Sequence, residues 1–151
     1  MTDATPLQQT FIKQYLSIPL HQHLQLSLEA FEHDQVTVKF PMQKALIGNP
    51  YTQILHGGTL AAALDAVSGL CAALTVFHKH TNLNEATIIE LITQITTSSI
   101  HINYLHPGIG DFFIVTASIL RSGRRLTVVE SQCQNHEKTL IATSSAHFMT
   151  G

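Results

Sequence analysis

The chain has little charge. Only 12% of its 151 residues are charged, about half of the roughly 25% that is typical of soluble domains. Eight basic and ten acidic residues give a net charge of −2 without a basic arm, which excludes a general nucleic-acid binder. Disorder is excluded as well, because 44% of the residues are hydrophobic. The low charge predicts that part of the surface is covered in an oligomer.

Cysteine is scarce too. Cys71 and Cys133 lack the spacing of a metal site or a redox motif. One disulfide between them is an alternative, but we expect two reduced, buried thiols, as in cytoplasmic proteins. The N-terminal segment lacks the basic charge and the apolar stretch of a signal peptide. These features together predict a cytoplasmic protein.

One long apolar run, Leu60–Phe77, is the sole candidate for a membrane span in the sequence. It contains Asp65, and an acid at the centre of a membrane helix costs about 2.5–3.5 kcal/mol. Small residues cover most faces of the helix, and a helix that is apolar nearly all round must be enclosed by other structure. We therefore expect no membrane insertion, but a buried central helix in one domain over residues 1–151.

Helical and alternating patterns predict the elements around this central helix. Thr5 and Pro6 open an N-terminal helix that runs to Leu16 and stops before Pro19. Asn82 or Asn84 caps a second helix that reaches Ile95.

The remaining segments alternate apolar and polar residues, as strands do. The expected elements are two strands at 24–28 and 36–40 with a turn at His33 and Asp34, a loop at 41–55, the central helix at 56–78, and four strands at 97–106, 111–120, 124–134 and 139–149. This order predicts an α+β fold in which an antiparallel sheet of about six strands wraps around one long helix.

The chemistry of the sequence is concentrated around Asp65. It is the one acid between Asp34 and Glu85, and it lies about two turns after Gly57 and Gly58. Free N–H groups at a helix start favour a developing negative charge. A carboxylate near such groups suits hydrolysis of an activated acyl group. The alternative is structural, with glycines that allow close packing and a locally satisfied carboxylate.

Three segments resemble the hotdog-fold acyl-CoA thioesterases of the phenylacetate-pathway type. HGGTLAAALDAVSGLCAAL, from His56 to Leu74, is similar to that family's central-helix signature. NYLHPG, from Asn103 to Gly108, and the RSGRR turn, from Arg121 to Arg125, match its later motifs. The N-terminal helix and the helix before the third strand resemble a bacterial subgroup of medium- and long-chain acyl-CoA thioesterases.

The resemblance implies a role for each matching residue. Asp65 is the catalytic carboxylate, acting as general base or nucleophile, and the Gly57 N–H binds the thioester carbonyl. His56 shapes the turn at the substrate, with Gly58 beside it. Asn49 corresponds to a polar loop residue that positions the carbonyl or the water. Relatives place that residue six positions before the histidine and Asn49 is seven before, so Gln53 is a substitute candidate.

The family also has a Ser or Thr that helps to hold the water. Thr97 falls at that position, and its neighbour Ser98 is the alternative.

The RSGRR turn contains four further candidates, Arg121, Gly123, Arg124 and Arg125. They form either a solvated turn or a contact to the phosphates of coenzyme A, which arginine forks suit.

The histidines give no metal signal, because the pairs His21–His23 and His78–His80 lack a third ligand at a recognisable spacing. His101 and His106 are candidates to line the pocket. We therefore expect no metal or cofactor, coenzyme A being part of the substrate.

The resemblance implies an acyl-CoA thioester hydrolase that releases a free fatty acid and coenzyme A. It also implies a homodimer with active sites at its interface, paired into a dimer of dimers. A hotdog enoyl-CoA hydratase, a non-catalytic acyl-CoA-binding protein and acyl-carrier-protein thioesters as substrates remain alternatives.

Overall fold

The computed structural model describes residues 4–80, 82 and 84–150. Within them, six antiparallel strands form one sheet in the order β1-β2-β6-β7-β8-β5. The strands are β1 (Ser27–Phe31), β2 (Gln35–Pro41), β5 (Thr96–Tyr104), β6 (Phe112–Ser122), β7 (Leu126–Asn135) and β8 (Leu140–Met149). β1 and β5 are the edges of this sheet, and β5 reaches its place by crossing back beside β8.

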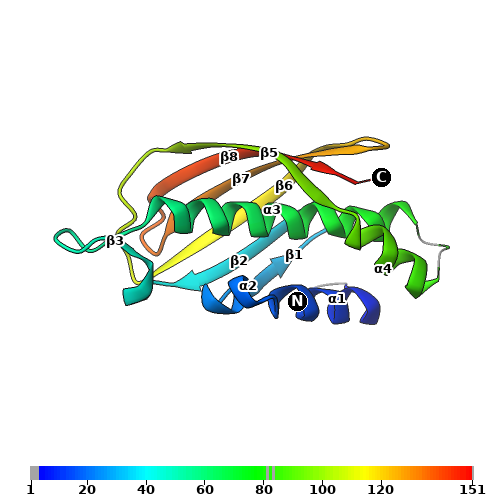
Figure 1. Cartoon of the computed structure of the whole chain (residues 1–151), viewed down its shortest axis with the longest axis horizontal. Helices are drawn as coiled ribbons and strands as arrows, with labels where there is room; N and C mark the ends of the chain where they lie inside the picture. Colours follow the sequence, from blue (N-terminus) through cyan, green and yellow to red (C-terminus); the bar gives the residue numbers. More distant parts are fainter. Residues whose placement is uncertain (1–3, 81, 83, 151) are drawn as a thin grey trace.

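The long helix α3 (Gly57–Lys79) runs across one face of the sheet (Figure 1). The strands β2, β6 and β7 alternate buried side chains with half-buried or exposed ones, so one face of each packs on the core. α3 is long and apolar enough to cross a membrane, yet 83% of its most apolar window is buried within the molecule. The predicted α+β architecture with a buried central helix is therefore confirmed.

The N-terminal helix α1 (Pro6–Leu16) is also confirmed. Thr5 and Gln8 form a capping box at its start. Phe11 contacts Phe77 of α3, with 5.6 Å between ring centroids. The hydroxyl of Tyr15 donates a hydrogen bond of 2.8 Å to the carbonyl of Ala66. α1 is thus fastened to α3 beside Asp65.

The first predicted strand begins too early in the sequence-based assignment. Pro19 opens the short helix α2 (Pro19–His23), because proline fits the first turn of a helix. Leu24 and Leu26 are buried, but Gln25 between them has a φ of 55°. This left-handed residue turns the chain, so the extended strand starts only at Ser27.

Three further segments differ from the prediction. The expected loop at 41–55 contains a short 3₁₀ helix (Lys44–Leu46) and a two-stranded ribbon of β3 (Ile47–Asn49) and β4 (Ile54–Leu55). β7 begins two residues later than expected, since the Gly123 N–H closes a tight turn on the carbonyl of Leu126 at 2.8 Å. The helix α4 (Glu85–Thr93) begins after the Asn84 cap, as predicted, but ends two residues before Ile95.

Candidate active site

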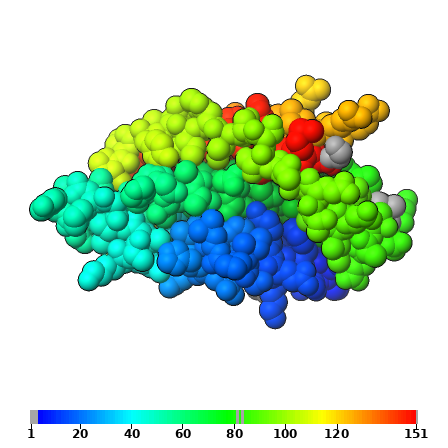
Figure 2. Space-filling view, in the orientation of Figure 1, coloured from blue at the N-terminus to red at the C-terminus, as the bar shows by residue number. Residues whose placement is uncertain are grey.

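Asp65 lies on a partly exposed face of α3. Gly58, Ala61, Ala62 and Asp65 follow helical spacing and are all accessible to solvent, whereas Ala66–Phe77 is buried. Figure 2 shows this part of α3 at the surface, between the blue N-terminal helices and the yellow-green β5. The carboxylate therefore stands at the end of a strip of small residues that is open to an approaching molecule.

The structure brings two of the candidate site residues, Thr97 and Asp65, into contact. The Thr97 hydroxyl donates a hydrogen bond of 2.9 Å to Oδ1 of Asp65. The register of β5 against β8 shifts between Thr97 and Ser99, which leaves Ser98 in an irregularity of the edge strand. The bond holds the carboxylate in one orientation, and the hydroxyl oxygen of Thr97 keeps lone pairs that can accept from a water.

A small cavity of about 110 Å³ opens beside Asp65. Its polar end is formed by Tyr15, Asp65 and Thr97, and its apolar walls by Gly69, Ala73, Ile92, Ile95 and Phe148. Burial and the nearby charge of Asp65 raise the pKa of Tyr15 above its usual value. The Tyr15 phenol thus stays neutral and donates its hydrogen bond to the carbonyl of Ala66.

The N-terminus of α3 offers one free amide. The Gly58 N–H donates to Nδ1 of His56 at 2.8 Å, and the Thr59 N–H to the carbonyl of His56 at 2.9 Å. The Gly57 N–H donates no hydrogen bond within the described part of the chain. His56 therefore caps the helix, and the Gly57 N–H is available to an anion at the helix start.

Tyr104 and the NYLHPG segment enclose this amide. The Tyr104 hydroxyl donates to the carbonyl of Gly57 at 3.0 Å. A Cβ at Gly57 would stand 3.4 Å from the Tyr104 ring, which is ordinary van der Waals contact. A pocket of about 350 Å³ is lined here by Gly57, Leu60 and residues 104–108, among others.

Gly57 and Asp65 lie in different pockets of the same protomer. Eight residues separate them, which corresponds to about 12 Å along the helix axis. A single thioester carbonyl needs an oxyanion donor at about 3 Å and a base or nucleophile close to the same carbon. One protomer alone therefore does not bring the two groups onto one substrate.

Neither polar loop candidate reaches Asp65 in the described chain. Asn49 Oδ1 accepts from the N–H groups of Tyr51 and Thr52, at 2.9 and 3.4 Å. The side-chain amide of Gln53 donates to the carbonyl of Pro50. Both side chains stabilise the tip of the β3–β4 ribbon, which projects beyond the N-terminal end of α3 (Figure 1).

The RSGRR turn lies at the opposite end of α3 from Gly57. Arg121, Arg124 and Arg125 are exposed, and the Lys79 ammonium donates to the carbonyl of Gly123 at 2.7 Å. Lys79 is about 21 Å from Asp65 along the helix. Within one protomer, these arginines stand well away from both Gly57 and Asp65.

The histidines take structural or surface positions. His21 is buried, with Nδ1 2.7 Å from the carbonyl of Tyr15. His101 contacts Asn103, and His106 contacts the carbonyl of Leu140. Neither histidine lines the cavity beside Asp65, although His106 lines the pocket at Gly57.

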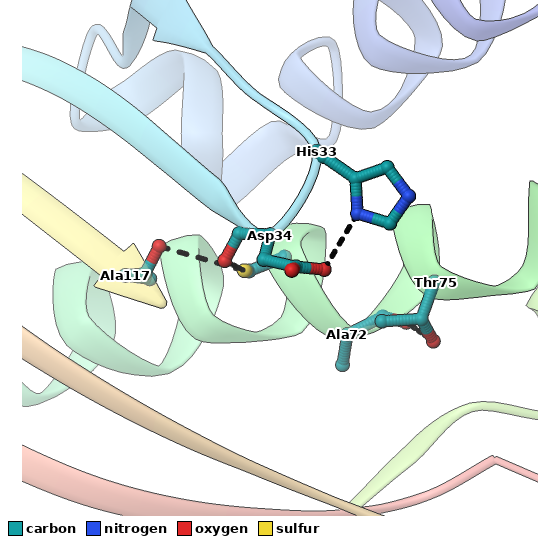
Figure 3. A network of polar contacts seen from close by, with 6 residues as sticks. His33, Asp34, Ala72, Thr75 and Ala117 are labelled. Carbon is teal, nitrogen blue, oxygen red and sulfur yellow. Dashed lines mark hydrogen bonds and ion pairs between the residues drawn. The ribbon is translucent and has the colours of Figure 1, made fainter. Parts of the chain in front are cut away.

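One cluster was missed by sequence reasoning. His33, Asp34 and His78 place their nitrogen and oxygen atoms within 4.8 Å of one another. Nδ1 of His33 reaches Asp34 at 2.8 Å, and the thiol of Cys71 donates to the carbonyls of Asp34 and Ala117 below them (Figure 3). The His33 and His78 rings stack in parallel, with 4.0 Å between their centroids. Among the described residues, three ligand atoms come together here, one fewer than the four of a structural zinc site.

Both cysteines are free and buried, as predicted. Burial raises the pKa of each thiol to about 12.

Tyr15 and Tyr104 are the site residues that sequence reasoning missed. Tyr104 lies in the NYLHPG motif and could have been found there, whereas no local signal in α1 connects Tyr15 to Asp65.

The sheet wrapped around α3, with a carboxylate and a free helix-start amide on that helix, defines a hotdog-fold protein. The Thioesterase superfamily matches residues 52–142. The chain is 31% identical over 134 residues to the medium/long-chain acyl-CoA thioesterase YigI of Escherichia coli K12. The aligned residues cover 89% of this chain and 86% of that protein. The chain therefore belongs to the thioesterase superfamily and is an enzyme of the thioester-hydrolase class.

Solved structures agree with this family. A protein of Shewanella oneidensis related to the thioesterase superfamily is 31% identical, with a TM-score of 0.88 over 98% of this chain and 100% of the other. A thioesterase of Haemophilus influenzae has a TM-score of 0.75 over 97% of this chain and 91% of that one. Its 20% identity shows the shared fold alone.

Proposed function

We propose that the protein hydrolyses medium- or long-chain acyl-CoA thioesters to a free fatty acid and coenzyme A. The observation that carries the proposal is the hydrogen bond of 2.9 Å that fixes Asp65 through Thr97 at the mouth of a cavity with apolar walls. The similarity to YigI favours acyl-CoA as the substrate. The two free thiols suit the cytoplasm, where this reaction is expected.

In this proposal, Asp65 drives the attack on the thioester carbonyl. In one route, the carboxylate takes a proton from a water that also donates a hydrogen bond to the Thr97 hydroxyl. In the other, the carboxylate attacks the carbonyl carbon itself, and water then hydrolyses the anhydride. The Gly57 N–H stabilises the oxyanion in both routes. A single turnover in ¹⁸O-water distinguishes them, since label enters Asp65 only if the anhydride forms.

The distance of about 12 Å between Gly57 and Asp65 on one helix leads us to propose a shared site. If two α3 helices cross antiparallel near Ala61, midway between them, Gly57 of one protomer lies beside Asp65 of the other. Gly58, Ala61 and Ala62 are small and accessible, so the helices can approach closely. β5, a nine-residue edge strand on the same side, pairs with its copy and removes the exposed edge.

The activity is tested by thiol release from saturated acyl-CoAs of C2 to C18 and from aryl-CoAs. We expect wild type to turn over and Asp65→Asn to lose about 10²- to 10⁴-fold in kcat, because the base or nucleophile is removed. Asp111→Asn, at an exposed aspartate outside both pockets, is the matched control and keeps its activity. Hydration of an enoyl-CoA with no thiol release, or binding without turnover, would overturn the proposal.

A further inference from the structure

The cavity beside Asp65 has a polar end and an apolar end. Asp65 and Thr97 stand at the polar end, and Gly69 and Ala73 continue along the same face of α3 at intervals of four residues. Ile92, Ile95 and Phe148 complete the lining with hydrocarbon side chains. The cavity therefore continues directly from the carboxylate into a lining that suits a hydrocarbon chain.

From this continuity we infer that the cavity is the acyl-chain subsite, and that Ile92 and Ile95 are residues that determine chain length. The inference rests on the proposed function. Ile92 lies on α4 and Ile95 two residues beyond its end, and both line the cavity together with Ala73 of α3. Gly69 and Ala73 have small side chains or none, which leaves room for the cavity, and the side chains of Ile92 and Ile95 form its wall.

The size of the cavity explains why its outer wall matters. Its volume is about 110 Å³, while a cavity of roughly 150 Å³ in another protein is enough to hold benzene. The space at hand thus accepts the first carbons of an acyl chain, and a longer chain meets the wall built by Ile92 and Ile95.

α4 is suited to yield to such a chain. Within Glu85–Thr93, Ile88 is the fully buried residue, and Ile89 is 42% exposed. Ile92 and Ile95 are themselves only partly buried. Shortening either side chain therefore opens the cavity outward without removing a central part of the core.

The test compares kcat/KM over saturated acyl-CoAs of C4 to C16 for variants that change the cavity in opposite directions. Ile92→Ala and Ile95→Ala enlarge it, and we expect the preference to shift to longer chains by about 4-fold per added methylene. Ala73→Leu fills the cavity, and we expect the opposite shift. Ile89→Ala is the matched control, being the same change on the exposed side of the same helix.

The outcomes separate the two proposals. If wild type hydrolyses none of the esters, the proposed function fails. If wild type is active but the three cavity variants, with unchanged thermal unfolding, keep the chain-length profile of Ile89→Ala, the subsite assignment alone is overturned. Opposite shifts in the enlarged and the filled cavity support it.

Discussion

Thr97 is the residue through which the edge strand reaches the carboxylate on the central helix. Its hydroxyl donates a hydrogen bond of 2.9 Å to Asp65 and so orients the carboxylate. Its neighbour Ser98, the alternative that sequence reasoning left open, lies at the register shift of β5 and makes no side-chain hydrogen bond within the described residues. The geometry therefore favours Thr97 as the positioning residue.

Thr97→Val removes the hydroxyl and keeps the shape of the side chain. A hydrogen bond to a charged group contributes about 1.5–3 kcal/mol, and because Thr97 is exposed we take the lower end, which corresponds to about a tenfold fall in kcat. Steady-state kinetics of Thr97→Val and Ser98→Ala measure this. A loss in Ser98→Ala with an unaffected Thr97→Val would reverse the assignment.

His78 makes folding sensitive to pH. Burial, together with the neighbouring His33, lowers the pKa of His78, while Asp34 opposes the shift. Since the pKa in the folded state lies below the value of about 6.5 in the unfolded chain, the unfolded state binds more protons at acidic pH. Stability is therefore lost as the pH falls below about 6.5.

Replacement of His78 by glutamine should reduce this loss. We expect the fall in unfolding midpoint between pH 7 and pH 5 to be smaller in His78→Gln than in wild type. His101→Gln, on β5 away from His33 and Asp34, controls for the change of residue type. An equal pH dependence in wild type and His78→Gln would contradict the assignment.

At the scale of elements, α1 and α3 are joined where Gly69 meets Tyr15. A Cβ at Gly69 would stand 2.7 Å from the Tyr15 hydroxyl, closer than van der Waals contact allows. The glycine thus permits Tyr15 to reach the carbonyl of Ala66 and to close the cavity at Asp65.

Gly69→Ala should therefore destabilise the protein by about 1–3 kcal/mol, as overpacking does. The cost should be smaller in a Tyr15→Phe background, because the clashing hydroxyl is absent there. Chemical denaturation of the two single variants and the double variant measures the coupling. Additive effects would show that the two groups do not meet.

The elements show what the sequence could and could not predict. α3 and the four C-terminal strands follow from long apolar or alternating patterns. The boundary at Ser27 could not be predicted, because the left-handed Gln25 and the helix opened by Pro19 depend on local backbone geometry. The ribbon within residues 41–55 could not be predicted either, because its strands have only three and two residues and show no alternating pattern.

The residues of the site that lie in family motifs could be predicted from the sequence, whereas their contacts could not. The hydrogen bond between Asp65 and Thr97 joins residues 32 positions apart. The family resemblance named both residues, but not their contact. Asn49 and Gln53 were chosen by spacing, but a spacing does not reveal that the turn itself occupies both side chains. The role of Tyr15 depends on how α1 packs on α3, which no local pattern encodes.

At the scale of the whole molecule, one protomer holds two halves of a site. The free amide of Gly57 lies in one pocket and the carboxylate of Asp65 in another, about 12 Å along the same helix. In the proposed dimer, a two-fold antiparallel crossing of α3 near Ala61 would complete two sites at once. The pairing of such dimers into a tetramer, and a contact of Arg124 with coenzyme A phosphates, stay predictions.

The most direct measurement is the activity of mixed dimers made by refolding Asp65→Asn and Gly57→Pro together. Proline at the first helical position removes the N–H but fits there, since His56 before it has an extended conformation with φ −66° and ψ 134°. Each variant alone should be inactive. With a shared site, half of the dimers are mixed and each keeps one complete site of two, so about a quarter of wild-type activity returns. No recovery, with mixed dimers confirmed by mass, would contradict the shared site.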